Sequence, residues 1–244
     1  MRVYSKSDIG LRRTSNQDYC KTGSFPDGAV WAVVCDGMGG ANGGCTASSV
    51  SAETIASYLC SEYNEGLDDG ELRALMEEAV RRANTEVYNM AQGDDSLYGM
   101  GTTVICATVK NGRAHIVHAG DSRAYLYDGE KLYQITTDHS FVQELVNIGK
   151  LTREQARVHP ERNLITRALG LEPTLETDYN SVEFTDNSLL LICTDGMSEY
   201  ITDDMLSDYI NNYGEEELID KLISCAKELG GSDNITVAVI AGRS

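Results

Sequence analysis

The stretch that decides the fold is Leu189-Leu190-Leu191-Ile192-Cys193-Thr194-Asp195-Gly196. Its short apolar run, bounded by polar residues, is typical of a buried strand. The run ends in an aspartate followed by a glycine, so a carboxylate sits directly on a rigid strand end. The same arrangement recurs where Ala32-Val33-Val34-Cys35 runs into Asp36-Gly37.

Two further acids occupy similar places. Asp121 follows the apolar stretch at 116–120, and Asp233 lies in a glycine-containing loop before the last apolar run. One Asp-Gly pair after a strand is a common turn signal. Four acids at strand ends indicate more, because carboxylates brought together repel one another unless a cation neutralises them. All-oxygen ligands predict magnesium or manganese.

The remaining pattern predicts an α+β fold in a single domain. The turns Lys110-Asn111-Gly112 and Asp128-Gly129 favour antiparallel hairpins. Amphipathic periodicity predicts helices over 46–60, 71–92 and 218–229, grouped apart from the strands. The predicted strands cover 2–9, 29–35, 102–109, 114–119, 123–127, 131–135, 189–193 and 235–240.

Composition limits the partners. The 20 Lys and Arg against 38 Asp and Glu give a net charge of −18, which argues against nucleic acid and anionic membranes as partners. The same excess of acid predicts substrates with basic residues near the reacting group. Seven scattered cysteines and no membrane-length apolar segment predict a cytoplasmic protein without a disulfide framework. We expect a monomer.

Other functional motifs fit poorly. The glycine-rich segment at 37–44 follows a strand and precedes a helix, but Asn42 stands where a dinucleotide fingerprint needs its third glycine. A P-loop would need a Gly-Lys-Ser/Thr ending, and a serine hydrolase would need a Gly-x-Ser-x-Gly elbow. Both signatures are missing from the sequence.

A series of ordered motifs resembles bacterial protein phosphatases of the 2C type. The series starts with Asp8-x-Gly10-x-x-Arg13-x-x-Asn16-Gln17-Asp18 and ends with Asp233-Asn234-Ile235-Thr236. The resemblance runs from about residue 3 to residue 240. The intervening motifs lie at 36–40, 99–103, 120–123, 137–140, 159–163, 166–170 and 194–196.

The resemblance implies a four-layer αββα sandwich of two antiparallel sheets flanked by helices. Residues 1–244 would form one catalytic domain, with a flap at about 139–163 beside the site. Asp36 would bridge two Mn²⁺ or Mg²⁺ ions, with the Gly37 carbonyl on one of them. Asp195 and Asp233 would complete the other metal's protein ligands, and Asp121 would join Asp195 at a third site.

The resemblance also implies an activity. A water activated by the two metals would attack the phosphorus of phosphoserine or phosphothreonine in line, with Arg13 gripping the phosphate. The substrates would be phosphorylated proteins, and the enzyme would oppose a bacterial Ser/Thr kinase. Asp18, Asn234 and His139 would support the site from behind.

Some features of the activity stay open at the sequence level. Met38 stands where many relatives carry a histidine proposed as general acid, so protonation of the leaving group falls first to water and second to His139. A non-catalytic regulatory module and a hydrolase of small phosphate esters remain alternatives. Retention of Asp36, Asp195 and Asp233 favours the phosphoprotein phosphatase.

Overall fold

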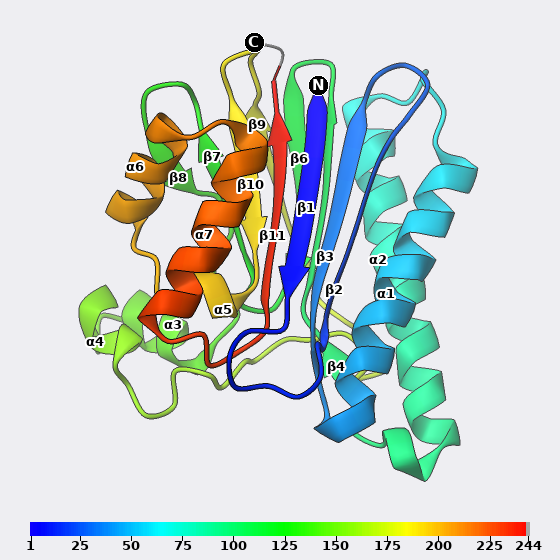
Figure 1. The fold of residues 1–244 in the computed structure, drawn as a ribbon. Coiled ribbons are helices and arrows are strands. Elements are labelled where there is room, and N and C mark those ends of the chain that lie inside the picture. The colour runs from blue at the N-terminus through cyan, green and yellow to red at the C-terminus, as the bar shows by residue number, and fades with distance from the viewer. Residues whose placement is uncertain (243–244) are drawn as a thin grey trace.

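Two antiparallel sheets lie face to face with helices on both outer sides (Figure 1). The computed structural model describes residues 1–242, except for the side chains of residues 41 and 42. The first sheet has the order β1 (Arg2–Asp8), β11 (Ile235–Ala241), β10 (Leu189–Cys193), β7 (Arg123–Tyr127) and β8 (Leu132–Gln134). The second has β2 (Asp18–Ser24), β3 (Val30–Met38), β5 (Val104–Lys110), β6 (Arg113–Ala119) and β9 (Asp178–Glu183), with β4 (Gly101–Thr102) pairing β3.

The helices form the two outer layers and the flap. Helices α1 (Gly40–Glu62) and α2 (Asp69–Gly93) cover the second sheet. The first sheet is covered by α5 (Asp195–Ser198), α6 (Asp203–Asn212) and α7 (Glu215–Leu229). The flap holds α3 (Phe141–Asn147) and α4 (Arg153–Arg157), and a 3-10 turn η1 (Asp95–Leu97) follows α2.

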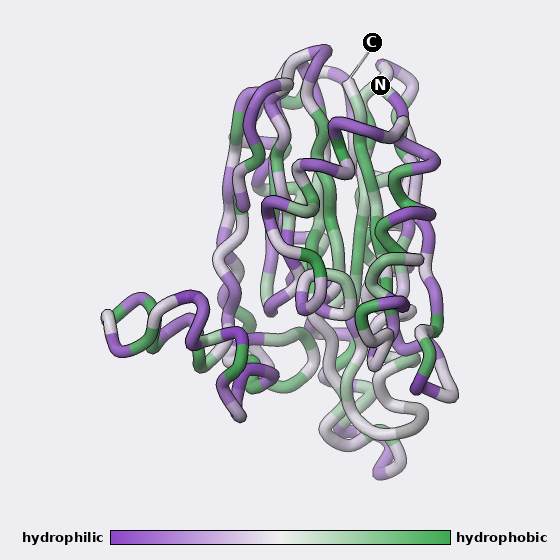
Figure 2. Tube along the Cα trace, turned by 60° about the vertical axis from the view of Figure 1, so that its left-hand side comes forward, coloured by the Kyte–Doolittle hydropathy of each residue, from purple (hydrophilic) through white to green (hydrophobic). Residues whose placement is uncertain are grey.

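Successive side chains of each strand point to opposite faces of the sheet, and the apolar ones form three layers. In β10, Leu190 and Ile192 face the other sheet, whereas Leu191 and Cys193 face the helices. Because successive side chains point to opposite faces, a continuous apolar run is what a strand covered on both sides requires. Figure 2 shows the hydrophobic segments gathered along the inner strands. The predicted αββα sandwich is confirmed.

The predicted turns and helices form for the expected local reasons. Asn111 and Gly112 both have positive φ, 48° and 76°, which suits the tight β5–β6 hairpin. Helix α2 starts with a capping box between Asp68 and Glu71. The two short helices of the flap each begin with a Ser or Thr cap.

The sequence prediction missed strands β2 and β9 and helices α5 and α6. Helix α5 has only four residues, too few for a periodic signal. Strands β2 and β9 are largely polar and only half-buried, because they lie at the edges of the second sheet. Helix α6 buries only Leu206, so its periodic apolar signal is weak. Helix α1 also starts earlier than expected, at Gly40 rather than near residue 46.

The topology brings the predicted site residues to one end of the sandwich. The last residue of β1, Asp8, pairs with the first residue of β11, and Asp18 at the start of β2 pairs with Asp36 near the end of β3. The flap lies at this end, and the N-terminus lies at the opposite end (Figure 1). Among the described helices, none is long and apolar enough to span a lipid bilayer.

Candidate active site

Four carboxylates converge on one cavity at this end of the sandwich. The cavity has a volume of about 480 Å³. Asp36 comes from β3, Asp121 from the bend after β6, Asp195 from the first residue of α5, and Asp233 from the loop before β11. The structure therefore brings together all four acids that the sequence singled out, and Arg13 lines the same cavity.

The backbone at Asp36 is held on both sides. Its amide donates to Thr103 Oγ1 at 3.0 Å, and its carbonyl accepts from the Thr103 amide and from Thr102 Oγ1, each at 2.8 Å. The next residue must be glycine, because a Cβ at Gly37 would lie 2.1 Å from the Gly44 carbonyl oxygen. Close approach of α1 to β3 therefore fixes the Asp-Gly pair in place.

The carboxylates disfavour one another's charge. Burial, followed by the charges of Asp18, Asp195, Asp121 and Asp233, raises the pKa of Asp36 well above its usual value. Burial and then the charge of Asp195 raise the pKa of Asp121 in the same way. Burial and the charge of Asp233 raise the pKa of Asp195 to about 6. A cation among these groups would remove the repulsion that raises these values.

Asp195 carries an unused ligand atom. Its Oδ1 is buried and has no hydrogen-bond partner among the described residues. A buried carboxylate oxygen without a partner is costly, so a native structure rarely retains one without a reason. The acids that line the cavity offer carboxylate oxygens, which suit Mg²⁺ or Mn²⁺. The residues present therefore fit a divalent-cation site.

Arg13 stands at the rim of the cavity. Its guanidinium donates to Asp233 Oδ2 at 2.7 Å, and about half of its side chain, 49%, is exposed. Asn234 holds the loop that carries it: the Asn234 side chain accepts from the Gln17 amide at 2.8 Å and donates to the carbonyls of Ile9 and Ser15. The guanidinium thus keeps free donors that face solvent beside the acids.

Asp18 lies behind the cavity rather than in its lining. It is buried, and Thr194 Oγ1 donates to its Oδ2 at 2.9 Å. The same hydroxyl accepts from the Thr236 amide at 3.0 Å, which ties the residue before Asp195 to β11. Burial raises the pKa of Asp18 to about 7. The sequence does not reveal the roles of Thr103 and Thr194, because only tertiary pairing shows what their hydroxyls contact.

His139 also lies behind the site. Its Nδ1 accepts from the Gly120 amide at 3.2 Å, which leaves Nε2 protonated and 3.3 Å from Asp178 Oδ2. His118 stacks on it with ring centroids 4.7 Å apart. His118, His139 and Asp178 bring possible ligand atoms within 4.8 Å of one another. The Gly120 amide nevertheless favours a hydrogen-bonded network there, because a protonated Nε2 cannot bind a metal.

Fold and site together define a class of protein. A cluster of carboxylates that fits divalent cations, with an arginine fork beside it, provides both the means to activate water and a grip on a phosphate group. This combination at the end of an αββα sandwich is that of a metal-dependent hydrolase of phosphate esters.

Comparison with known proteins identifies the family. The model of the protein phosphatase 2C family matches residues 11–236. Protein phosphatase PhpP of Streptococcus pneumoniae is 32% identical over 244 residues, covering 99% of this chain and 97% of the relative. The chain belongs to the protein phosphatase 2C family, and the predicted class of phosphoprotein phosphatase is confirmed.

Solved structures agree in fold. The serine/threonine phosphatase of S. agalactiae superposes with a TM-score of 0.91 at 30% identity, covering 99% of both chains. The catalytic domain of the phosphatase PstP, solved in complex with two manganese ions, superposes with a TM-score of 0.85 at 33% identity, covering 98% of this chain and 96% of that one. This relative, PstP, therefore binds manganese.

Proposed function

We propose that this chain is a Mn²⁺- or Mg²⁺-dependent protein serine/threonine phosphatase that acts in the cytoplasm as a monomer. The observation that carries the proposal is the convergence of Asp36, Asp121, Asp195 and Asp233 on one cavity that Arg13 also lines. The names of the relatives support serine and threonine as the phosphorylated residues. Its substrates are phosphorylated proteins, and it opposes a Ser/Thr kinase of the same cell.

Residues 1–244 form one catalytic domain in this proposal. Asp36, the Gly37 carbonyl, Asp195 and Asp233 would hold two divalent cations, and Asp121 with Asp195 would hold a third. The orphaned Oδ1 of Asp195 and the raised pKa values of the acids support this assignment. Bound cations would supply Lewis-acid activation of a water molecule for attack on phosphorus.

The chain's own residues position the substrate and the acids. Arg13 can offer two guanidinium N–H groups to two oxygens of the substrate phosphate, once it turns from Asp233. Thr103 fixes the backbone of Asp36, and Thr194 with Asp18 fixes the start of α5. His139 acts as a support for Gly120 rather than as a general acid, because it is absent from the lining of the cavity.

Hydrolysis of a phosphothreonine peptide tests the proposal. The wild-type chain should release phosphate with Mn²⁺ and stop when EDTA is added. Asp195→Asn should lose the activity, whereas the matched control Asp204→Asn, an exposed acid on α6, should keep it. Competition between the peptide and a small phosphate ester separates a protein phosphatase from a small-ester hydrolase. The absence of metal-dependent turnover in the wild type would overturn the proposal.

A further inference from the structure

A second cavity opens beside the acidic one, between the flap and the segment at 195–203. It has a volume of about 570 Å³. Asp121, Asn163 and Asp195 line both cavities, so the two share a wall. A substrate segment whose phosphate lies at the acidic cavity therefore has its neighbouring residues within reach of the second one.

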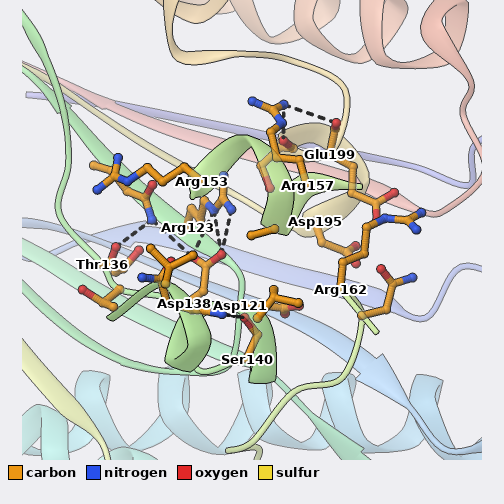
Figure 3. Close-up of a pocket in the computed structure, with 18 of the residues that line it drawn as sticks. Asp121, Arg123, Thr136, Asp138, Ser140, Arg153, Arg157, Arg162, Asp195 and Glu199 are labelled. Carbon is orange, nitrogen blue, oxygen red and sulfur yellow. Dashed lines mark hydrogen bonds and ion pairs between the residues drawn. The ribbon is translucent and has the colours of Figure 1, made fainter. Parts of the chain in front are cut away.

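Two arginines of the flap give this cavity its character (Figure 3). Arg153 and Arg157 stand four residues apart on α4, and both line the cavity. Within the described residues, neither forms an ion pair with a carboxylate. The Arg157 guanidinium contacts only the carbonyl oxygens of Ser198 and Glu199, each at a long 3.4 Å. Most other arginines of the described residues do pair with a carboxylate.

The other charged groups on the flap side of the cavity already have compensating partners. Arg123 donates twice to Asp138 Oδ2 and once to Oδ1, at 2.7–3.1 Å. Arg162 lies 3.3 Å from Glu199. Asp203 lies in the first turn of α6, where free backbone N–H groups favour a negative charge. Asp121 and Asp195, on the wall shared with the acidic cavity, belong to the proposed cation site, so the charge left unmatched on the flap side is the positive charge of Arg153 and Arg157.

Local contacts decide what enters the cavity. The net charge of −18 predicted a preference for basic substrates, but charges more than about 8 Å apart are largely screened at physiological salt. A guanidinium fork matches the oxygens of a carboxylate or phosphate at contact distance. The lining therefore favours an anionic group at this place, contrary to the expectation from total charge.

We propose that this cavity is a second anion-binding subsite, which takes an acidic or phosphorylated side chain a few residues from the phosphoresidue under attack. The inference rests on the proposed function, because it assigns the substrate class of the same enzyme. Arg153 and Arg157 are the recognition residues, and they select substrates rather than take part in hydrolysis.

Peptide binding tests the subsite without catalysis. The probes are fluorescent peptides with a non-hydrolysable phosphonate analogue of phosphothreonine, flanked by Ala, Glu or a second phosphonate. Affinity is measured by anisotropy with Mn²⁺ present. The Glu or phosphonate peptide should bind about tenfold more tightly than the Ala peptide, as expected for charge-assisted hydrogen bonds. Which of the two gains more tells whether a carboxylate or a phosphate is the natural occupant.

Matched variants separate the local effect from net charge. Arg153→Gln/Arg157→Gln should bind all three peptides with the wild-type affinity for the Ala peptide, and should keep the wild-type Tm. The control Arg73→Gln/Arg81→Gln removes the same charge from exposed positions on α2 and should retain the tenfold preference. Equal wild-type affinities, no measurable binding, or a preference that survives in the flap variant would overturn the subsite. Failure of the proposed function shows separately, as a lack of Mn²⁺-dependent hydrolysis of the singly phosphorylated peptide.

Discussion

Gly196→Ala tests how closely the backbone at Gly196 must approach the backbone at Asn234. A Cβ at this position would lie 1.9 Å from the Asn234 carbonyl oxygen, whereas ordinary contacts start at 3.4 Å. The start of α5 and the start of β11 must therefore separate by about 1.5 Å. Overpacking of this kind costs about 1–3 kcal/mol. A shift of Asn234 also moves Asp233. Because the Asn234 side chain donates to the carbonyls of Ile9 and Ser15, the same shift moves the loop that carries Arg13.

Thermal unfolding and Mn²⁺ titration measure the effect of Gly196→Ala. We expect the Tm to fall by roughly 2–4 °C per kcal/mol, and the Mn²⁺ affinity to fall because Asp195 and Asp233 move apart. Gly93→Ala is the matched control, since nothing lies within 4 Å of its Cβ, and alanine in a helix should leave the Tm equal or slightly higher. A Gly196→Ala protein with wild-type Tm and wild-type Mn²⁺ affinity would refute the reasoning.

Three further perturbations probe the charges and the core. Asp195→Asn should raise the Tm of the metal-free protein, because burial and Asp233 disfavour its charge, and should abolish the Mn²⁺-induced rise in Tm; a preserved rise would contradict the assignment. Folding raises the pKa values of Asp18 and Asp195 to about 7 and about 6. Between about pH 4 and 7 the native state therefore binds more protons than the unfolded state. The stability that these two groups contribute to the metal-free protein falls as the pH rises through this range. Since Mn²⁺ displaces the proton of Asp195, its stabilising effect, followed by calorimetry from pH 5 to 8, should grow with pH, and a flat profile would count against metal binding by Asp195. Leu191→Ala, at a fully buried position facing the helices, should lower the free energy of unfolding by about 2–5 kcal/mol in urea denaturation, and a loss under 1 kcal/mol would show that this face is not packed as described.

The fold was predictable where the apolar pattern of a single chain segment is enough to identify a strand or a helix. The apolar run of β10 indicates burial on both faces, and its adjacent residues Leu190 and Leu191 do face different layers. The edge strands β2 and β9 were missed because a half-buried edge strand needs few apolar residues. Helix α6 was missed for the same reason, with Leu206 as its one buried residue.

In the site, too, some residues could be predicted from the sequence and others only from the tertiary structure. Asp36 and Asp195 could be singled out because each comes at the end of an apolar run, and antiparallel topology then brings these ends together. The roles of Thr103 and Thr194 depend on pairing between strands far apart in sequence. Arg153 was likewise unremarkable in the sequence, because its lack of a carboxylate partner is visible only once α4 is placed against the segment at 195–203.

The four carboxylates should hold the divalent cations of this phosphatase, and anomalous diffraction from crystals grown with Mn²⁺ would locate those ions. We expect two strong manganese peaks in the acidic cavity, with Asp36 in contact with both, and a weaker third peak between Asp121 and Asp195. Peaks at His118, His139 and Asp178 instead, or an acidic cavity that stays empty at saturating Mn²⁺, would contradict this expectation.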